Sequence, residues 1–376
     1  MRKSSHLSSS MNKREQFERT LDVEGRFLVK ILCAHVRKED LPVLPERLNW
    51  RTFIQLCYST HYAGILSDLI KAYDPNEIPS EVFQQLKSYQ LRVMTSNERL
   101  LHQYANLERL ANERQLTLYP LKGITLMPNL YERPYHRHIS DIDVLIDNKD
   151  LSTWENLLKT DGFKLKRRLA KSRFHEQMNL KYDPLQAFKQ NTVVDFHVSL
   201  NSGFHHIDFP IASLMENHET SHELNQIDQY IFVCLHAYKH LYYGQLNVLH
   251  LMDIFLMNKQ ISTSDLWTRC ERFQCTKEVQ QVLDLTLFFF GYSSKQIPNW
   301  QISVLQKELM AIPFTFRMRQ LFFYRKHLRI PVSWKQLPSY LWFQVFPNAA
   351  YLRQSDGKSS YVVNWWSRCI RMILNR

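Results

Sequence analysis

Ser140-Asp141-Ile142-Asp143-Val144-Leu145-Ile146 is the most informative segment of this 376-residue chain, and Leu121-Lys122-Gly123 precedes it by a short interval. In an apolar run of this kind, residues two apart in a strand point to the same face, so the Asp141 and Asp143 carboxylates are expected side by side. Two negative charges so close repel each other unless a cation lies between them. Mg²⁺ prefers oxygen ligands and is usually held by one or two carboxylates together with substrate phosphates. The segment therefore predicts metal-dependent phosphate chemistry.

The order of three motifs resembles that of a known family. The motifs are Lys122-Gly123, Arg137-His138-Ile139-Ser140-Asp141-Ile142-Asp143 and Val194-Asp195-Phe196-His197. They resemble the nucleotidyltransferases of the DNA polymerase β superfamily, and more narrowly its NTP_transf_5 branch of uncharacterised nucleotidyltransferases. The resemblance spans roughly residues 80 to 260 and includes His236-Ala237-Tyr238-Lys239-His240 and Leu249 to Asp253. A single glycine after Lys122 departs from the Gly-Ser or Gly-Gly of the superfamily, but the narrower branch commonly has Lys-Gly there.

The resemblance implies a division of roles among three aspartates. Nucleotidyl transfer uses two cations about 4 Å apart, which stabilise the attacking and the leaving oxygens. Asp141 and Asp143 are expected to hold the cation on the triphosphate. Asp195, on a neighbouring strand, is expected to hold the second cation and to assist deprotonation of the acceptor hydroxyl. The expected cofactor is Mg²⁺ or Mn²⁺, and the expected donor is an NTP.

Other residues near these motifs are expected to contact the nucleotide. Lys122 would neutralise triphosphate charge, and Gly123 would let the backbone and the N–H groups of the following helix approach phosphate. Arg137 would contact a phosphate oxygen through its planar guanidinium. Ser140 would either orient the phosphates or cap the turn. His197 shares one strand face with Asp195, and it would either bind the acceptor or brace that aspartate.

A second group lies on a later helix. His236, Lys239 and His240 fall on one helical face, so they form a basic stripe that is expected to bind the nucleotide, with Lys239 as the leading candidate. His236 and His240 also have the i, i+4 spacing of a metal-binding pair, but position 237 is Ala, which excludes the zinc-protease pattern. The alternative is a packed helix of histidines with a surface lysine. Asp253 belongs to the same group.

The predicted fold class is α+β, with a small mixed-sheet nucleotidyltransferase core embedded between two helical regions. We expect a flexible tail over residues 1–12, a helical N-terminal region over 13–115, the core over 116–208 and a helical C-terminal region over 209–376. Prolines divide residues 14–115 into about three helices. Within the core we expect strands at 116–121, 140–147, 163–168, 174–182 and 191–199. Helices are expected at 122–131, 151–160, 247–257 and 263–290, and a loop containing Asp183-Pro184 joins the last two strands.

Charge is concentrated near the C-terminus. The net charge is +12, and residues 313–376 contain 11 Lys and Arg residues against one acid, Asp356. This basic segment suggests an anionic partner, namely nucleic acid, an acidic membrane surface or a phosphorylated carrier, and the alternative is a solvated basic face. Residues 361–374 form a potential amphipathic helix, which we expect to dock on the protein core rather than on a membrane.

The remaining features favour a cytoplasmic location. No apolar run reaches the roughly 18 residues that span a bilayer, and the basic N-terminus lacks the apolar core of a secretory signal. The six cysteines form no Cys-x-x-Cys pair, which argues against a zinc site and suits a reducing compartment.

Taken together, these features predict a metal-dependent nucleotidyltransferase that moves an NMP from an NTP to a hydroxyl or phosphate of an unidentified small-molecule, glycan or peptide acceptor and releases pyrophosphate. ATP is the default donor because it is abundant. Two alternatives remain. One is a catalytically silent module of the same fold that binds nucleotide or a partner, and the other is a transferase directed to RNA by the basic C-terminal segment.

Overall fold

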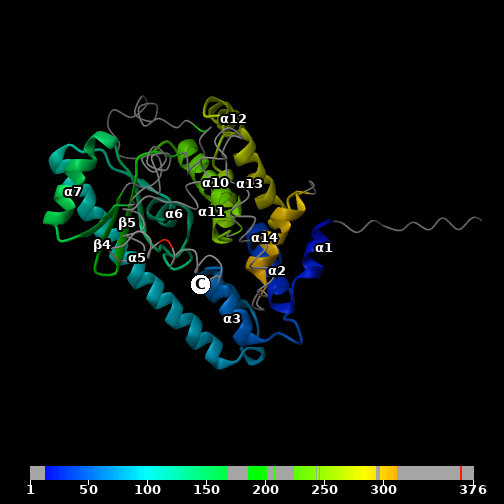
Figure 1. The fold of residues 1–376 in the computed structure, drawn as a ribbon. Helices are drawn as coiled ribbons and strands as arrows, with labels where there is room; N and C mark the ends of the chain where they lie inside the picture. The colour runs from blue at the N-terminus through cyan, green and yellow to red at the C-terminus, as the bar shows by residue number, and fades with distance from the viewer. Residues whose placement is uncertain are drawn as a thin grey trace, which may run out of the picture. The chain divides into compact units, whose positions relative to one another are not determined.

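The structure is a computed structural model that describes residues 13–167, 185–200, 207, 224–242, 244, 246–293, 297–310 and 365 (Figure 1). Its contacts divide the chain into two compact units, each built from separate segments. The helical unit comprises Met1–Glu98, Leu126–Ile139 and Val233–Leu328. The sheet unit comprises Arg99–Thr125, Ser140–Phe232 and Arg329–Arg376. The four predicted regions stay predictions.

The helices in the described part of the chain are as follows. The N-terminal ones are α1 (Lys13–Thr20), α2 (Val23–Arg37), α3 (Trp50–Ser59), α4 (Ala63–Leu69) and α5 (Ser80–Arg114), with short 3₁₀ turns at Ile70–Ala72 and Pro75–Glu77. The later ones are α6 (Gly123–Leu130), α7 (Leu151–Thr160), α10 (Gln226–Tyr242), α11 (Leu249–Asn258), α12 (Thr263–Arg272), α13 (Thr276–Phe289) and α14 (Asn299–Leu309).

Two stretches that were predicted as helical contain more separate helices than their prolines indicate. Residues 13–114, all described, contain five α-helices rather than about three. One extra break is at Asp22, whose side chain caps α2 by accepting a hydrogen bond from the Gly25 N–H at 2.8 Å. Another is at His61, which has a left-handed φ of 63°. The predicted helix at 263–290 is likewise two helices, because Gln274 has a φ of 55° between α12 and α13.

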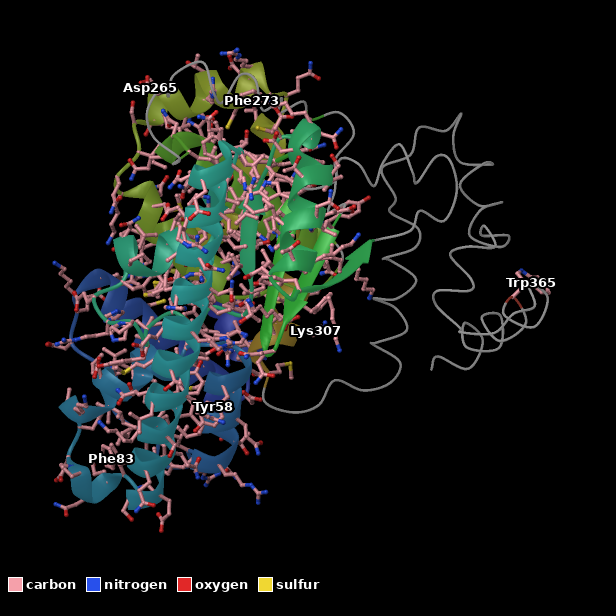
Figure 2. The ribbon with its side chains drawn as sticks, turned by 90° about the vertical axis from the view of Figure 1, so that its left-hand side faces the viewer. Tyr58, Phe83, Asp265, Phe273, Lys307 and Trp365 are labelled. Atoms are coloured by element: carbon pink, nitrogen blue, oxygen red, sulfur yellow. The ribbon has the colours of Figure 1, made fainter. Side chains whose placement is uncertain are left out.

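The helical unit has an extended apolar core. It contains the buried rings of Phe27 and Phe53, whose centroids are 5.1 Å apart, and apolar side chains from α1 to α5 and from α10, α11, α13 and α14. Tyr58 of α3 and Phe83 of α5 are partly buried against this core (Figure 2). The packing follows from helices that each bury one apolar face.

The sheet unit confirms the predicted α+β class. In the described part of the chain its sheet has five strands, β1 (Tyr119–Leu121), β2 (Ile142–Leu145), β3 (Lys164–Arg167), β4 (Leu185–Lys189) and β5 (Thr192–His197), in the order β1-β2-β5-β4-β3. β2 and β5 are parallel and the other neighbours are antiparallel, so the sheet is mixed. Helix α7 packs on β3, and its buried Trp154 ring lies 5.5 Å from the Phe196 ring of β5.

One strand lies where a loop was predicted. Residues 185–189 form β4, which pairs with β5 through a two-residue turn at Gln190 and Asn191. The loop prediction was wrong there because Leu185 and Ala187 are buried while the residues between them are not, which is the alternation of a half-buried strand. Gln190 closes the turn with a φ of 53°, a conformation for which glutamine gives no sequence signal.

Several predicted features lie outside the described residues. They are the tail at 1–12, the strand at 174–182 and, apart from Trp365, the basic segment and amphipathic helix after residue 312. Within the residues that are described, no helix is long and apolar enough to cross a membrane. Cys33, Cys57, Cys234, Cys270 and Cys275 are buried free thiols.

Candidate metal centre

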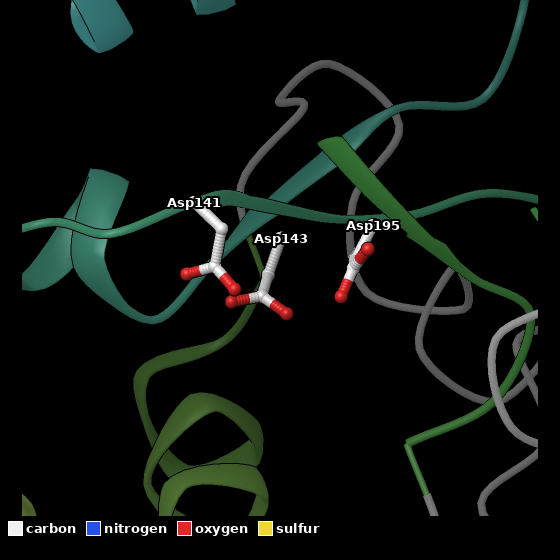
Figure 3. Close-up of side chains that lie close together, drawn as sticks. All are labelled: Asp141, Asp143 and Asp195. Carbon is white, nitrogen blue, oxygen red and sulfur yellow. The ribbon is translucent and has the colours of Figure 1, made fainter. Parts of the chain in front are cut away.

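The parallel pairing of β2 with β5 places two aspartates side by side. Asp143 is the second residue of β2, and its register partner on β5 is Asp195. Asp141 directly precedes β2, two residues before Asp143, and therefore projects to the same side. Figure 3 shows the three carboxylates pointing the same way. Two segments that are far apart in the sequence thus place three carboxylates on the same side of the strand pair.

The three carboxylates are close enough to share cations. Asp141, Asp143 and Asp195 each offer one oxygen, and these oxygens lie within 4.8 Å of one another. Asp143 is buried, with 4% of its surface exposed, and the other two are partly buried. Among the described residues this is the group of three or more acidic, histidine or cysteine ligands that is already assembled.

The electrostatics of the cluster show excess negative charge. Burial, together with the nearby Asp143 and Asp195 carboxylates, raises the pKa of Asp141 to about 6, although Lys122 and a hydrogen bond from Ser140 oppose the rise. Burial also acts to raise the pKa of Asp143, but the Lys122 ammonium and a hydrogen bond with His197 outweigh it and hold that pKa well below its usual range. The Lys122 ammonium therefore neutralises the charge of Asp143. The Asp141 carboxylate remains close to other negative charge, which disfavours its ionised form.

Lys122 and His197 both bind the central aspartate. Lys122 Nζ donates to Asp143 Oδ1 at 2.7 Å, and His197 Nε2 is hydrogen-bonded to the same oxygen at 2.7 Å. Lys122 has a φ of 50° in the turn between β1 and α6, and its Nζ lies 5.5 Å from the Phe232 ring centroid. The Thr125 hydroxyl donates to the Lys122 carbonyl at 3.0 Å and so fixes this turn.

Two further side chains orient the outer carboxylates. The Ser140 hydroxyl donates to Asp141 Oδ1 at 2.8 Å. Gln186 on β4 is the register partner of Asp195, and its Nε2 donates to Asp195 Oδ1 at 2.6 Å. Gln186 was not identified from the sequence, because it lies in the segment predicted as a loop. The alternation of Leu185 and Ala187 was the signal that could have placed it on a strand.

The donor set suits a hard divalent cation. Three carboxylates converge, and the raised pKa of Asp141 indicates that additional positive charge would stabilise the ionised cluster. Mg²⁺ and Mn²⁺ bind such oxygen ligands, whereas the cluster offers no thiolate that would select a softer metal. Asp141, Asp143 and Asp195 are the residues that would hold it.

The remaining predicted site residues are distributed between the units. Gly123 is buried and begins α6, the position expected for a phosphate-binding helix start. Arg137 and Lys239 belong to the helical unit. Arg137 is buried, and its Nε and Nη2 donate to the two oxygens of Asp253 at 2.8 Å each, a bidentate ion pair. Lys239 is a half-buried residue of α10. Their predicted contacts with nucleotide stay predictions.

Comparison with known proteins gives one match. A family model described as "Uncharacterised nucleotidyltransferase" matches residues 46–291, about two thirds of the chain. No curated protein and no solved structure matches it. The matched range contains all three aspartates of the metal centre, as well as Lys122 and His197.

Proposed function

The chain belongs to the uncharacterised nucleotidyltransferase family NTP_transf_5, and from this membership we propose that it is a metal-dependent enzyme that transfers an NMP from an NTP to an acceptor and releases pyrophosphate. The observation that supports this proposal most directly is the convergence of Asp141, Asp143 and Asp195 within 4.8 Å. All three acids are present, whereas a degenerate binding module would be free to lose one.

The aspartates divide the work of the transfer. Bound divalent cations would neutralise the charge that develops on the attacking and leaving oxygens. Asp141 and Asp143 face the triphosphate, and Asp195 accepts the proton of the acceptor hydroxyl as its oxygen attacks the α-phosphorus. The new oxygen–phosphorus bond forms while the bond from the α-phosphorus to pyrophosphate breaks. Gln186 holds one oxygen of Asp195 and so leaves a defined orientation for the other.

The groups around the aspartates position the triphosphate. Lys122 is bound to Asp143 in this structure, and we propose that its ammonium also contacts phosphate when an NTP is bound. The N–H groups at the start of α6, beginning with Gly123, offer further donors to phosphate oxygens. His197 braces Asp143 through a 2.7 Å hydrogen bond. Ser140 completes the proposed nucleotide contacts within the sheet unit, and the contacts expected of Arg137 and Lys239, which belong to the helical unit, stay predictions.

The substrates are proposed at the level of chemical class. The donor is an NTP, with ATP as the default, and the acceptor is a hydroxyl or phosphate of a small molecule, glycan or peptide. The basic segment at 313–376 is proposed to bind an anionic partner. The cytoplasmic location inferred from the cysteine pattern stays a prediction.

The test is pyrophosphate release and intact mass of candidate acceptors with each NTP in Mg²⁺ or Mn²⁺. Wild type is compared with Asp141→Asn/Asp143→Asn. The matched control is Asp265→Asn, which changes an exposed aspartate in the first turn of α12 (Figure 2). We expect release and mass shift in wild type and in the control. In the double variant we expect the rate of pyrophosphate release to fall by more than ~10–100-fold, which is the usual cost of mutating a residue that only hydrogen-bonds to a metal ligand.

A second measurement separates the enzyme from a silent module. Binding of labelled ATP is titrated with and without Mn²⁺ in wild type and in Asp141→Asn/Asp143→Asn. Binding that depends on Mn²⁺ and on the aspartates, without pyrophosphate release for any NTP and acceptor pool, would overturn the transferase proposal and establish a nucleotide-binding module. Absence of Mn²⁺-dependent binding would overturn both.

A further inference from the structure

Strand β3 carries two lysines to which the proposed reaction gives no role. Lys164 and Lys166 are exposed, and in the part of the chain that the structure describes neither side chain makes a hydrogen bond or an ion pair. Residues two apart in a strand point to the same face of its sheet, so the two ammonium groups project to one side. We refer to these residues as the β3 lysine pair.

The strand register places the β3 lysine pair on the face of the sheet that carries the metal centre. Lys166 is the register partner of Gln186, which is the partner of Asp195, which in turn is the partner of Asp143. Register partners on neighbouring strands point to the same face. The hydrogen bond from Gln186 Nε2 to Asp195 Oδ1 at 2.6 Å confirms this orientation in the middle of the row.

The opposite face of the sheet is covered by helix α7. Phe196 follows Asp195 and therefore points to that opposite face, where its buried ring lies 5.5 Å from the Trp154 ring of α7. Lys189 alternates with Gln186 along β4 and also belongs to that face, where its Nζ donates to Asp161 Oδ2 at 2.8 Å. The β3 lysine pair thus lies on the face away from α7 and has no carboxylate partner there among the described residues.

The row of register partners leads from the donor side of the proposed reaction to its acceptor side. Neighbouring strands are about 4.8 Å apart, so the backbone of Lys166 lies about 10 Å from that of Asp195. In phosphoryl transfer the attacking and leaving oxygens are roughly in line. With the triphosphate at Asp141 and Asp143, the acceptor hydroxyl approaches on the Asp195 side, and the rest of the acceptor extends over β4 towards β3.

We propose that the β3 lysine pair binds a phosphate group of the acceptor, so that the acceptor is a phosphorylated compound whose reacting hydroxyl lies at Asp195. The proposal rests on the proposed transferase function and specifies the acceptor of the same site. Ammonium groups bind phosphate through charge-assisted hydrogen bonds, and two of them match the charge of a phosphate monoester. The pair also places positive charge on a face where three carboxylates would otherwise repel an anionic acceptor.

Protection of a sheet edge is the alternative role for the same lysines. β3 is an outer strand of the described sheet, and charged side chains on outer strands oppose pairing with strands of other chains. That role requires charge on the strand but no ligand. The two roles therefore differ in whether a phosphorylated compound binds and in whether its affinity depends on the pair.

The test measures equilibrium binding of two phosphate-bearing probes to the full chain, with Mn²⁺ and a non-hydrolysable ATP analogue present to occupy the donor side. Glucose 6-phosphate represents a sugar phosphate and is compared with glucose, and a single-stranded RNA hexamer represents a nucleic-acid acceptor. Wild type is compared with Lys164→Gln/Lys166→Gln. The control is Lys87→Gln/Lys159→Gln, which removes the same charge from two exposed lysines on α5 and α7.

We expect wild type and the control to bind at least one phosphorylated probe and not to bind glucose. Loss of the charge-assisted hydrogen bonds should weaken that binding by at least about tenfold in Lys164→Gln/Lys166→Gln. Lys164→Arg/Lys166→Arg keeps both charges and should restore most of the affinity. The probe that responds identifies the source of the phosphate, and unfolding curves verify that each variant folds.

Two results would overturn the proposal. One is absence of binding by both phosphorylated probes in wild type, and the other is equal affinity in wild type and folded Lys164→Gln/Lys166→Gln, which would leave edge protection as the role of the pair. Mn²⁺-dependent binding of ATP and pyrophosphate release are measured on the same samples. If both persist in wild type while the probes give either result, the acceptor assignment fails and the transferase proposal stands.

Discussion

Gln186 is a neutral side chain that fixes the orientation of one carboxylate in the candidate metal centre. Its amide holds Asp195 Oδ1 at 2.6 Å from the neighbouring strand. Without this donor the Asp195 side chain would gain rotational freedom, and the proposed cation would bind less well. Residues that orient metal ligands in this way are worth about 10–100-fold in affinity.

We predict that Gln186→Leu weakens Mn²⁺ binding by about 10–100-fold, measured by the electron paramagnetic resonance signal of free Mn²⁺. The control is Gln280→Leu, which removes a similar glutamine–aspartate hydrogen bond, Gln280 Nε2 to Asp284 Oδ1 at 2.8 Å, from α13. Equal Mn²⁺ affinity in wild type and Gln186→Leu would show that Asp195 needs no such support.

Asp68 makes stability depend on pH at the acid end. Burial acts to raise its pKa, but hydrogen bonds from Lys71, His136 and Tyr135 lower it to about 2. Because the folded-state pKa is below the unfolded value of about 3.9, the unfolded chain takes up the proton first as pH falls. The stabilisation is therefore complete above about pH 4 and is lost toward pH 2.

We predict that Asp68→Asn lowers the free energy of unfolding at pH 6 by about 1 kcal/mol, a value reduced by solvent screening of this partly exposed group. The difference from wild type should shrink between pH 4 and pH 2 in urea titrations. A difference that stays constant over this range would mean that the Asp68 charge contributes nothing to stability.

At the scale of elements, a glycine allows one helix of the helical unit to lie directly against another stretch of backbone. A Cβ added to Gly64 of α4 would lie 1.8 Å from the Tyr135 carbonyl oxygen, which is backbone and cannot rotate away. Gly162, in the turn after α7, has a φ of 82° and nothing within 4 Å of an added Cβ. Alanine at position 64 therefore tests the cost of steric overlap, whereas alanine at position 162 tests the cost of backbone strain alone.

We predict that Gly64→Ala destabilises the protein by about 3 kcal/mol, at the upper end of overpacking costs, and that Gly162→Ala costs about 1 kcal/mol for the left-handed conformation alone. Urea unfolding followed by circular dichroism measures both. Equal costs would show that α4 can shift away from residue 135 without penalty.

The elements that the sequence predicted well are those with strong local signals. The helix at 151–160, the helix start at Gly123 and the strand around Asp143 follow from periodicity and turn residues. Strand β4 was missed because its evidence is pairing with β5, and a five-residue strand has little signal of its own. Helices end near His61 and Gln274 because these residues have left-handed φ values, which neither residue type indicates in the sequence.

The residues of the candidate site also differ in whether a local sequence pattern could predict them. The proximity of the three aspartates could be predicted because each lies in a motif with strand spacing. His197 was expected to bind the acceptor or to brace Asp195, and its hydrogen bond is instead with Asp143 on the neighbouring strand. Gln186 depends on the β4–β5 register, and the Arg137–Asp253 pair joins residues 116 positions apart. Long-range partners of this kind follow from the packed fold and not from local pattern.

At the scale of the whole molecule, charge is unevenly distributed along the chain. Of the net +12, residues 313–376 contribute 11 basic residues and one acid. If this segment binds a nucleic acid, the affinity arises from phosphate contacts that release counterions, and it must therefore fall with salt.

We predict that binding of a single-stranded RNA oligomer to the full chain weakens by at least about tenfold between 50 and 200 mM salt. Fluorescence anisotropy measures the affinity, and Arg325→Gln/Lys326→Gln/Arg329→Gln should reduce both the affinity and its salt dependence. Absent or salt-insensitive binding would remove RNA as a partner and leave a small-molecule, glycan or peptide acceptor.

The pairing of β2 with β5 also has a consequence for biosynthesis. Asp195 follows Asp141 by 54 residues, although the two carboxylates belong to one cluster. At 5–20 residues per second, a ribosome adds Asp195 about 3 to 11 s after Asp141. Throughout that interval the nascent chain contains Asp141 and Asp143 but lacks the third carboxylate. A cation that needs all three carboxylates would therefore be bound only after Asp195 has been added to the chain.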